Sequence, residues 1–148
     1  MNAGAHEIAD VIIASWILSG DGGPQGELTR IPTSHGLLDR ALQKTVERNA
    51  LPEWVKKNLH FVDSRTGLLC VELDSILNMA QRVNLTSAPN PTYRCAEVQV
   101  GASVAKQLLR DLDISVEAGK EWGKVLRDEV AKALADLGPS PEPALEGY

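Results

Sequence analysis

Apolar residues recur at helical spacing from the start of the chain, and Gly20 then provides a natural stop. The pattern predicts a helix over residues 6–19. Its apolar positions include Ile8, Val11, Ile12, Ile13, Trp16 and Ile17. So many apolar positions leave little polar surface. A helix that is apolar on most sides is usually enclosed by protein, so we expect this one at the centre of the core.

Further helices and short apolar strands alternate along the rest of the chain. Apolar spacing and capping residues predict helices over residues 34–49, 52–58, 74–83, 103–112 and 115–137. Period-two alternation and turn residues predict a β-hairpin over 59–73 and a third strand over 93–100. Glycine-rich residues 20–26 and polar residues 84–92 are expected to be loops.

This order of elements predicts an α+β fold, mainly helical, with a small antiparallel sheet of about three strands. At 148 residues the chain has the length of one domain, which we place at residues 1–137. The remaining segment, 138–148, is rich in proline and acidic, and we expect it to be a disordered tail.

The composition, with 43% hydrophobic and 24% charged residues, is that of an ordinary globular protein. It excludes a wholly disordered chain, a collagen-like repeat and a disulfide scaffold. The first residues lack the basic charge of a secretory signal, and the mostly apolar run over residues 11–18 is too short to span a bilayer. We therefore expect a cytoplasmic protein with no membrane contact.

No motif for catalysis or metal binding is present in the sequence. The histidines His6, His35 and His60 lie far apart, and Cys70 and Cys95 lack metal-ligand spacing. The Gly-x-Ser-x-Gly pattern is also absent. The sequence therefore predicts no catalytic residue, no metal and no cofactor, and favours a protein that is not an enzyme.

One short pattern gives an alternative to this view. Asp74, followed by Glu97 and Gln99 on one side of a predicted strand, resembles the D…(D/E)xK pattern of the restriction-endonuclease-like nucleases. The resemblance implies a Mg²⁺ ion held by Asp74 and Glu97. The family's lysine is replaced by Gln99, which carries no positive charge. As a structural alternative, Asp74 is expected to cap a helix and Glu97 to face solvent.

Charge is distributed unevenly along the chain. The formal net charge is −5, but residues 30–65 hold seven basic and four acidic side chains, a net charge of +3, which leaves −8 for the rest. An acidic protein with a basic segment can bind nucleic acid through that segment while its other surfaces repel incorrect docking.

The same part of the chain resembles the winged-helix domains of transcription regulators. Over residues 6–73 the predicted order is a helix, a weak second helical region near 25–31, the helix 34–49 and a hairpin, which matches helix, helix, helix and wing. The resemblance implies that the third helix enters the major groove and that Arg65, at the wing tip, contacts the backbone. The extra helix near Pro52 departs from that family.

The sequence therefore predicts a small, non-enzymatic regulatory protein that binds nucleic acid, with DNA as the possible partner, through a basic helix-plus-wing segment over residues 30–65. The candidate nucleic-acid-binding residues are Arg40, Gln43, Lys44, Arg48, Lys56, Lys57 and Arg65. The pattern also groups Asp39 with the polar residues that face away from the core.

The alternative function is a protein-protein interaction or assembly subunit that does not bind nucleic acid, and the Mg²⁺-dependent nuclease is the third hypothesis. The apolar stripe of the helix over 115–137 can pack internally or bind a partner, and a homodimer through it is our prediction.

Overall fold

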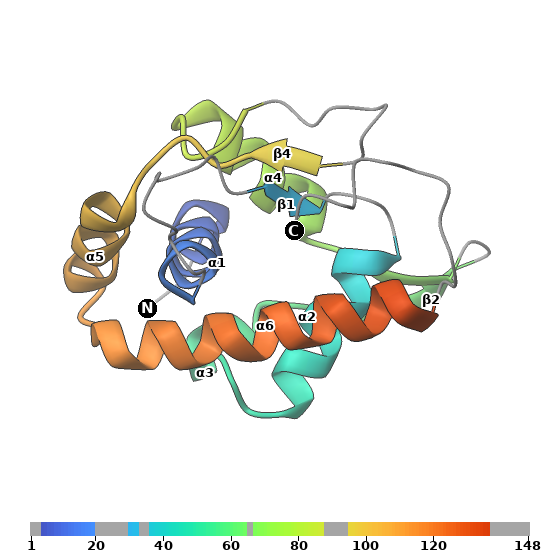
Figure 1. Ribbon diagram of the computed structural model, residues 1–148. Coiled ribbons are helices and arrows are strands. Elements are labelled where there is room, and N and C mark those ends of the chain that lie inside the picture. Colours follow the sequence, from blue (N-terminus) through green and yellow to red (C-terminus); the bar gives the residue numbers. More distant parts are fainter. Residues whose placement is uncertain (1–3, 20–29, 33–35, 65–66, 88–94, 137–148) are drawn as a thin grey trace.

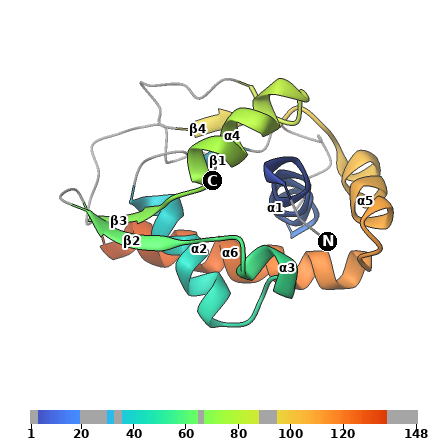
Figure 2. The same ribbon diagram turned by 180° about the vertical axis from the view of Figure 1, so that it is seen from behind.

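Helix α1 (Ala5–Ser19) lies between the other helices of the molecule (Figures 1 and 2). A computed structural model describes residues 4–19, 30–32, 36–64, 67–87 and 95–136 of the chain. Within α1, every residue over 8–16 is buried. Helices α4 (Leu73–Arg82), α5 (Ala102–Asp111) and α6 (Val116–Asp136) pack against it. The prediction of a central helix is confirmed.

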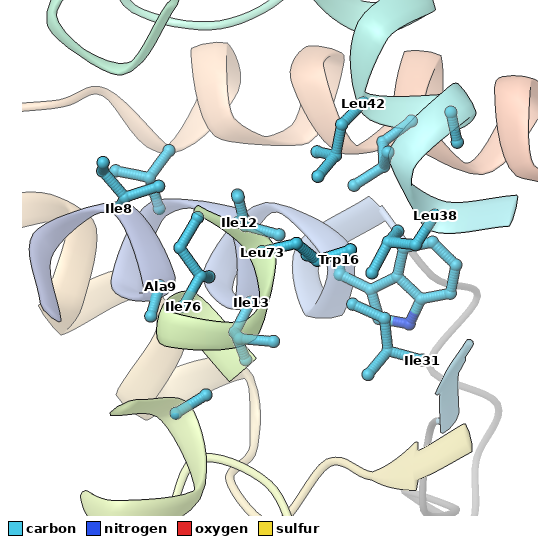
Figure 3. Close-up of a cluster of buried hydrophobic side chains, with 14 of the residues drawn as sticks. Ile8, Ala9, Ile12, Ile13, Trp16, Ile31, Leu38, Leu42, Leu73 and Ile76 are labelled. Atoms are coloured by element: carbon cyan, nitrogen blue, oxygen red, sulfur yellow. The ribbon is translucent and has the colours of Figure 1, made fainter. Parts of the chain in front are cut away.

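The described residues form six helices and four short strands. The remaining elements are β1 (Arg30–Pro32), α2 (Leu37–Glu47), α3 (Glu53–Lys56), β2 (Phe61–Ser64), β3 (Gly67–Cys70) and β4 (Cys95–Glu97). The predicted fold class is confirmed: the chain is a mainly helical α+β domain with little sheet. Side chains from α1, β1, α2 and α4 meet in one core cluster, which Figure 3 shows along α1 from Ile8 to Trp16.

The strands form two separate antiparallel pairs. Strands β2 and β3 make the predicted hairpin, with Phe61 opposite Cys70. Strand β1 pairs with β4 and places Ile31 opposite Ala96, and both of these side chains are buried. The sequence suggested a helical region at residues 25–31, but residues 30–32 are a strand. Since β1 pairs with β4 and not with the hairpin, the winged-helix arrangement is not shown.

The apolar stripe of helix α6 is buried inside the molecule. Leu126, Val130 and Ala133 are buried in the core cluster, and Trp122 and Leu134 pack partly buried against it. Their neighbours are mainly α1 and α2. Of the two uses that the sequence allowed for this stripe, internal packing is the one observed.

Helices α1 and α6 approach each other closely at Gly123. A Cβ atom added there would lie 1.9 Å from the carbonyl oxygen of Ser15. No side chain larger than hydrogen fits at that distance unless a helix moves. One turn earlier, a Cβ at Gly119 would instead meet the flexible side chain of Leu109, at 2.4 Å.

Arg127 completes the same interface by supplying charge to the end of α1. Its Nη2 and Nε donate hydrogen bonds to the Trp16 carbonyl at 2.6 and 3.1 Å, and Nε also lies 2.8 Å from Ser19 Oγ. The guanidinium stacks over the Trp16 ring, 4.2 Å from its centroid. A cation here donates to the Trp16 carbonyl in the last turn of α1 and opposes the helix dipole.

Three helices end in the same way, with a polar residue in the left-handed conformation. Those residues are Asn49, Asn84 and Asp113, with φ angles of 58°, 62° and 62°. After α4, for example, the N–H of Leu85 bonds the carbonyl of Ala80 at 2.8 Å, which is the Schellman pattern. The apolar residue that follows each turn then returns the chain to the core.

The predicted helix caps agree with the structure at one helix and differ from it at another. Ser115 caps α6 as predicted, since its Oγ accepts a hydrogen bond from the N–H of Ala118 at 3.1 Å. Helix α4 begins at Leu73, so Asp74 lies in its first turn and is not the cap. The loop over 20–26 and the tail over 138–148 lie outside the described residues.

Two glycine substitutions in α6 test the close helix crossing. Alanine raises helix propensity by about 1 kcal/mol at either position. At Gly119 the Leu109 side chain can rotate away, so Gly119→Ala should stay within about 1 kcal/mol of the wild type. Gly123→Ala meets a backbone carbonyl, and we expect it to lower the free energy of unfolding by about 2 kcal/mol or more.

Urea denaturation of the two variants and the wild type measures this difference. Equal effects of the two substitutions, or a more stable Gly123→Ala protein, would show that α1 and α6 do not cross at this distance.

Candidate functional site

The solvent-facing stripe of α2 carries four of the seven candidate residues. Arg40 and Lys44 are exposed, Gln43 is half-buried, and Arg48 follows directly after the helix. Their spacing of three or four residues places them on one side of α2. The opposite sides are buried, through Leu37, Leu38, Ala41, Leu42 and Thr45. The structure therefore brings these four candidate residues together along one side of α2 and its C-terminal end.

Asp39 is not on that face, which corrects the sequence-based assignment. It is fully buried, and its two oxygens accept different backbone hydrogen bonds: Oδ1 from the N–H of Gly36 at 2.9 Å, and Oδ2 from the N–H of Cys70 at 2.6 Å. The carboxylate thereby caps the start of α2 and fixes β3 to it. An acidic residue three positions after the cap residue can accept its backbone N–H, as the acid of a capping box does, so the spacing of Gly36 and Asp39 is the sequence signal for this role.

Arg48 joins the end of α2 to α6. Its Nη1 lies 2.8 Å from both Asp128 Oδ2 and Glu129 Oε2, and Lys132 Nζ lies 3.1 Å from the same Asp128 oxygen. Hydrogen bonds to Glu129 and then Asp128 raise the pKa of Arg48. Hydrogen bonds from Lys132 and then Arg48 lower the pKa of Asp128. The two cations and two carboxylates balance, so Arg48 holds two helices together.

The lysines differ in how strongly neighbouring carboxylates hold them. Lys44 lies 3.4 Å from Glu47, and both side chains are about half exposed. Lys56 is mostly buried and contacts Glu53 at 2.8 Å and the Asn49 side-chain oxygen. Its contact with Asn49 places the end of α3 beside the end of α2, and the neighbouring Lys57 is exposed. Arg65 lies outside the described residues.

The described residues do not form the metal site that the nuclease pattern implies. In the part of the chain that is described, no three His, Cys, Asp or Glu side chains are arranged to hold a metal ion. Glu97 lies in β4, where its N–H donates a hydrogen bond to Ser87 Oγ at 3.0 Å.

Cys70 is not a candidate nucleophile. Burial raises the pKa of its thiol to about 11, so the thiol is protonated at neutral pH.

His60 and Glu72 form a close pair beside the hairpin. One Glu72 oxygen accepts the backbone N–H of His60 at 2.7 Å, and the other lies 2.6 Å from its Nδ1. Glu72 also occupies the position before α4, where the sequence offered Asp74 as the cap. The contacts close the open end of the hairpin, and the sequence gave no sign of them.

Among the described residues, no helix is both long and apolar enough to cross a membrane.

Comparison of the chain with protein-family models, with curated proteins and with solved structures found no significant match. Function must therefore be inferred from the α2 stripe and its surroundings.

Substitutions of Asp39 test whether a buried carboxylate fixes the hairpin to α2. Asp39→Ala leaves the buried Cys70 N–H without its acceptor and should lower the free energy of unfolding by about 3 kcal/mol. Asp39→Asn retains one accepting oxygen and should lower it by less. Asp74→Ala, an exposed acid in the first turn of α4, is the control and should cost at most about 1 kcal/mol.

Chemical denaturation followed by circular dichroism gives all three values. An Asp39→Ala protein as stable as Asp74→Ala would contradict the role assigned to Asp39.

Proposed function

We propose that this protein is a small regulatory protein that binds nucleic acid through the exposed stripe of α2 and the adjoining end of α3. The observation that carries the proposal is the composition of this stripe. Its solvent-facing positions include Arg40, Gln43, Lys44 and Arg48, with Glu47 as the single acid of the helix surface. Lys57 extends the basic surface beyond the helix.

The negative charge of the rest of the chain favours binding of nucleic acid through the α2 stripe. Residues outside 30–65 carry a net charge of −8, so the protein as a whole repels a phosphate backbone. A local basic surface on an acidic protein favours approach through that surface alone. Such steering weakens with salt, because phosphate contacts release bound counterions.

The ion pairs divide the basic residues into two roles. The Lys44–Glu47 pair is exposed, and pairs of this kind contribute little, so a phosphate oxygen can replace Glu47. Arg48 is held by two carboxylates and Lys56 by Glu53 and Asn49. We therefore assign positioning roles to Arg48 and Lys56 and a phosphate contact to Lys44. On the ground of their exposure, we also assign phosphate contacts to Arg40 and Lys57. Gln43 has the donor and acceptor groups needed to contact a base edge.

A second candidate function, protein binding, is favoured by the outer face of the hairpin. Val62 and Val71 are 45% and 53% exposed. Val62 is opposite Leu69, and Val71 lies two residues beyond Leu69, so all three side chains share one face of the hairpin. With the α6 stripe buried, this face replaces residues 115–137 as the best surface for a protein partner. A homodimer stays a prediction.

A salt titration of nucleic-acid binding tests the main proposal. Arg40→Gln combined with Lys44→Gln removes two positive charges without touching the buried side of α2. If each made one phosphate contact, the slope of log K against log salt on duplex DNA should fall by about 1.8. Single-stranded DNA and RNA are titrated alongside, with fluorescence anisotropy as the readout.

The matched control is Lys120→Gln combined with Lys124→Gln on α6. Both lysines are exposed, and Lys124 has a weak partner, Glu121 at 3.5 Å, as Lys44 has Glu47. This control should leave the slope unchanged. Equal losses in the two double variants would mean that only net charge matters. A wild-type protein that binds none of the three nucleic acids at low salt would overturn the proposal and leave protein binding as the better candidate.

A further inference from the structure

Helix α5 packs on one side of α1. Ala14 and Leu18 of α1 and Ala105 and Leu109 of α5 form a small buried cluster, and the partly buried Leu108 of α5 packs against both this cluster and the main core. Figures 1 and 2 show α5 at the edge of the molecule, beside α1. Only two side chains of α5, Ala105 and Leu109, are fully buried, so we expect α5 to open at a lower free energy than global unfolding.

The stripe of α1 that faces α5 changes from apolar to ionisable along its length. His6, Asp10, Ala14 and Leu18 succeed one another at intervals of four residues, so they lie on one side of α1. The Leu18 end is sealed by the apolar cluster, whereas the other end holds Asp10. The α1–α5 interface therefore contains a carboxyl group beside its apolar contact.

Asp10 is buried without full hydrogen bonding. It is only 8% exposed, and its Oδ1 has no hydrogen-bond partner among the described residues. Its Oδ2 lies 3.5 Å from His6 Nε2. A buried polar atom that lacks a partner destabilises the folded state, and an ionised one does so more than a neutral one.

Ionisable groups on both helices modify the protonation of Asp10. They are His6 and Glu7 on α1 and Asp111 on α5. Burial raises the pKa of Asp10 above its ordinary value of 3.8; His6 acts in the opposite direction, and Glu7 and Asp111 raise the pKa further. Asp111 is the contribution from the facing helix, so part of this effect disappears when α5 moves away.

We propose that the α1–α5 interface is a pH-sensitive joint, in which α5 packs firmly on α1 when Asp10 is protonated and loosens when Asp10 is ionised. Opening uncovers the apolar surface of Ala14 and Leu18. The joint is independent of the α2 stripe, so it stands whether or not the protein binds nucleic acid.

The direction of the pH effect follows from linkage. The packed state has the higher Asp10 pKa, so it binds the proton more tightly than the open state. The resulting stabilisation is fully present below the ordinary pKa of 3.8 and is lost as the pH rises through the raised pKa. Carboxylates paired elsewhere respond in the opposite direction, as the lowered pKa of Asp128 illustrates.

Hydrogen exchange of the α5 amides tests the joint. Exchange is followed by NMR between about pH 4.5 and pH 7 and corrected for the intrinsic rate at each pH. In the wild type, α5 protection relative to the α4 amides should fall several-fold as the pH rises. The ratio to α4 removes any pH effect on the whole fold.

Three variants separate Asp10 from other acids. Asp10→Asn mimics the neutral form, so its α5 protection should not vary with pH and should equal the wild-type value under acid. Asp111→Asn removes a repelling charge and should move the fall in protection to lower pH. Asp74→Asn, an exposed acid on α4, should keep the wild-type profile. Constant α5 protection in the wild type, or a fall that persists in Asp10→Asn, would overturn the proposal.

Discussion

The structure depends on enclosing a helix that has almost no polar face. Helix α1 buries apolar side chains in almost every direction, so its stability depends on the helices that cover it. Helix α6 covers one side at very short range, because Gly123 allows it to approach the Ser15 carbonyl. Helices α4 and α5 cover further sides, and α2 is then fixed against α6. The basic stripe of α2 faces solvent because the apolar sides of that helix are used in this packing.

Polar side chains have structural roles at the ends of these elements. Arg127 pairs with the end of α1, Arg48 connects α2 to α6, and Asp39 joins the start of α2 to β3. Each contact links segments distant in sequence and satisfies groups that would otherwise be buried without partners. Asp10 Oδ1 and Ser15 Oγ are the exceptions, since both are buried and neither has a hydrogen-bond partner among the described residues. Of these two residues only Asp10 is ionisable, and its ionisation is therefore expected to affect packing.

Local patterns predicted most of the fold. Helical spacing identified α1, α2 and α6, and alternation with a turn identified the β2–β3 hairpin. Strand β1 was missed because three residues carry no readable period, and its pairing with β4 joins residues far apart in sequence. The winged-helix resemblance failed at this point. For the candidate site, spacing placed four residues on one face of α2, but partners from α6 were not visible in the sequence of α2 alone.

The enclosure of α1 is the claim on which the positions of the other elements depend, and native-state hydrogen exchange at increasing denaturant measures it most directly. If α1 is enclosed on all sides, its amides exchange only when the whole molecule unfolds, with the free energy and denaturant dependence of global unfolding. The buried amides of α1 should then be among the slowest in the protein. Exchange of those amides through a local opening with a clearly lower free energy than that of α2 or α6 would contradict the account.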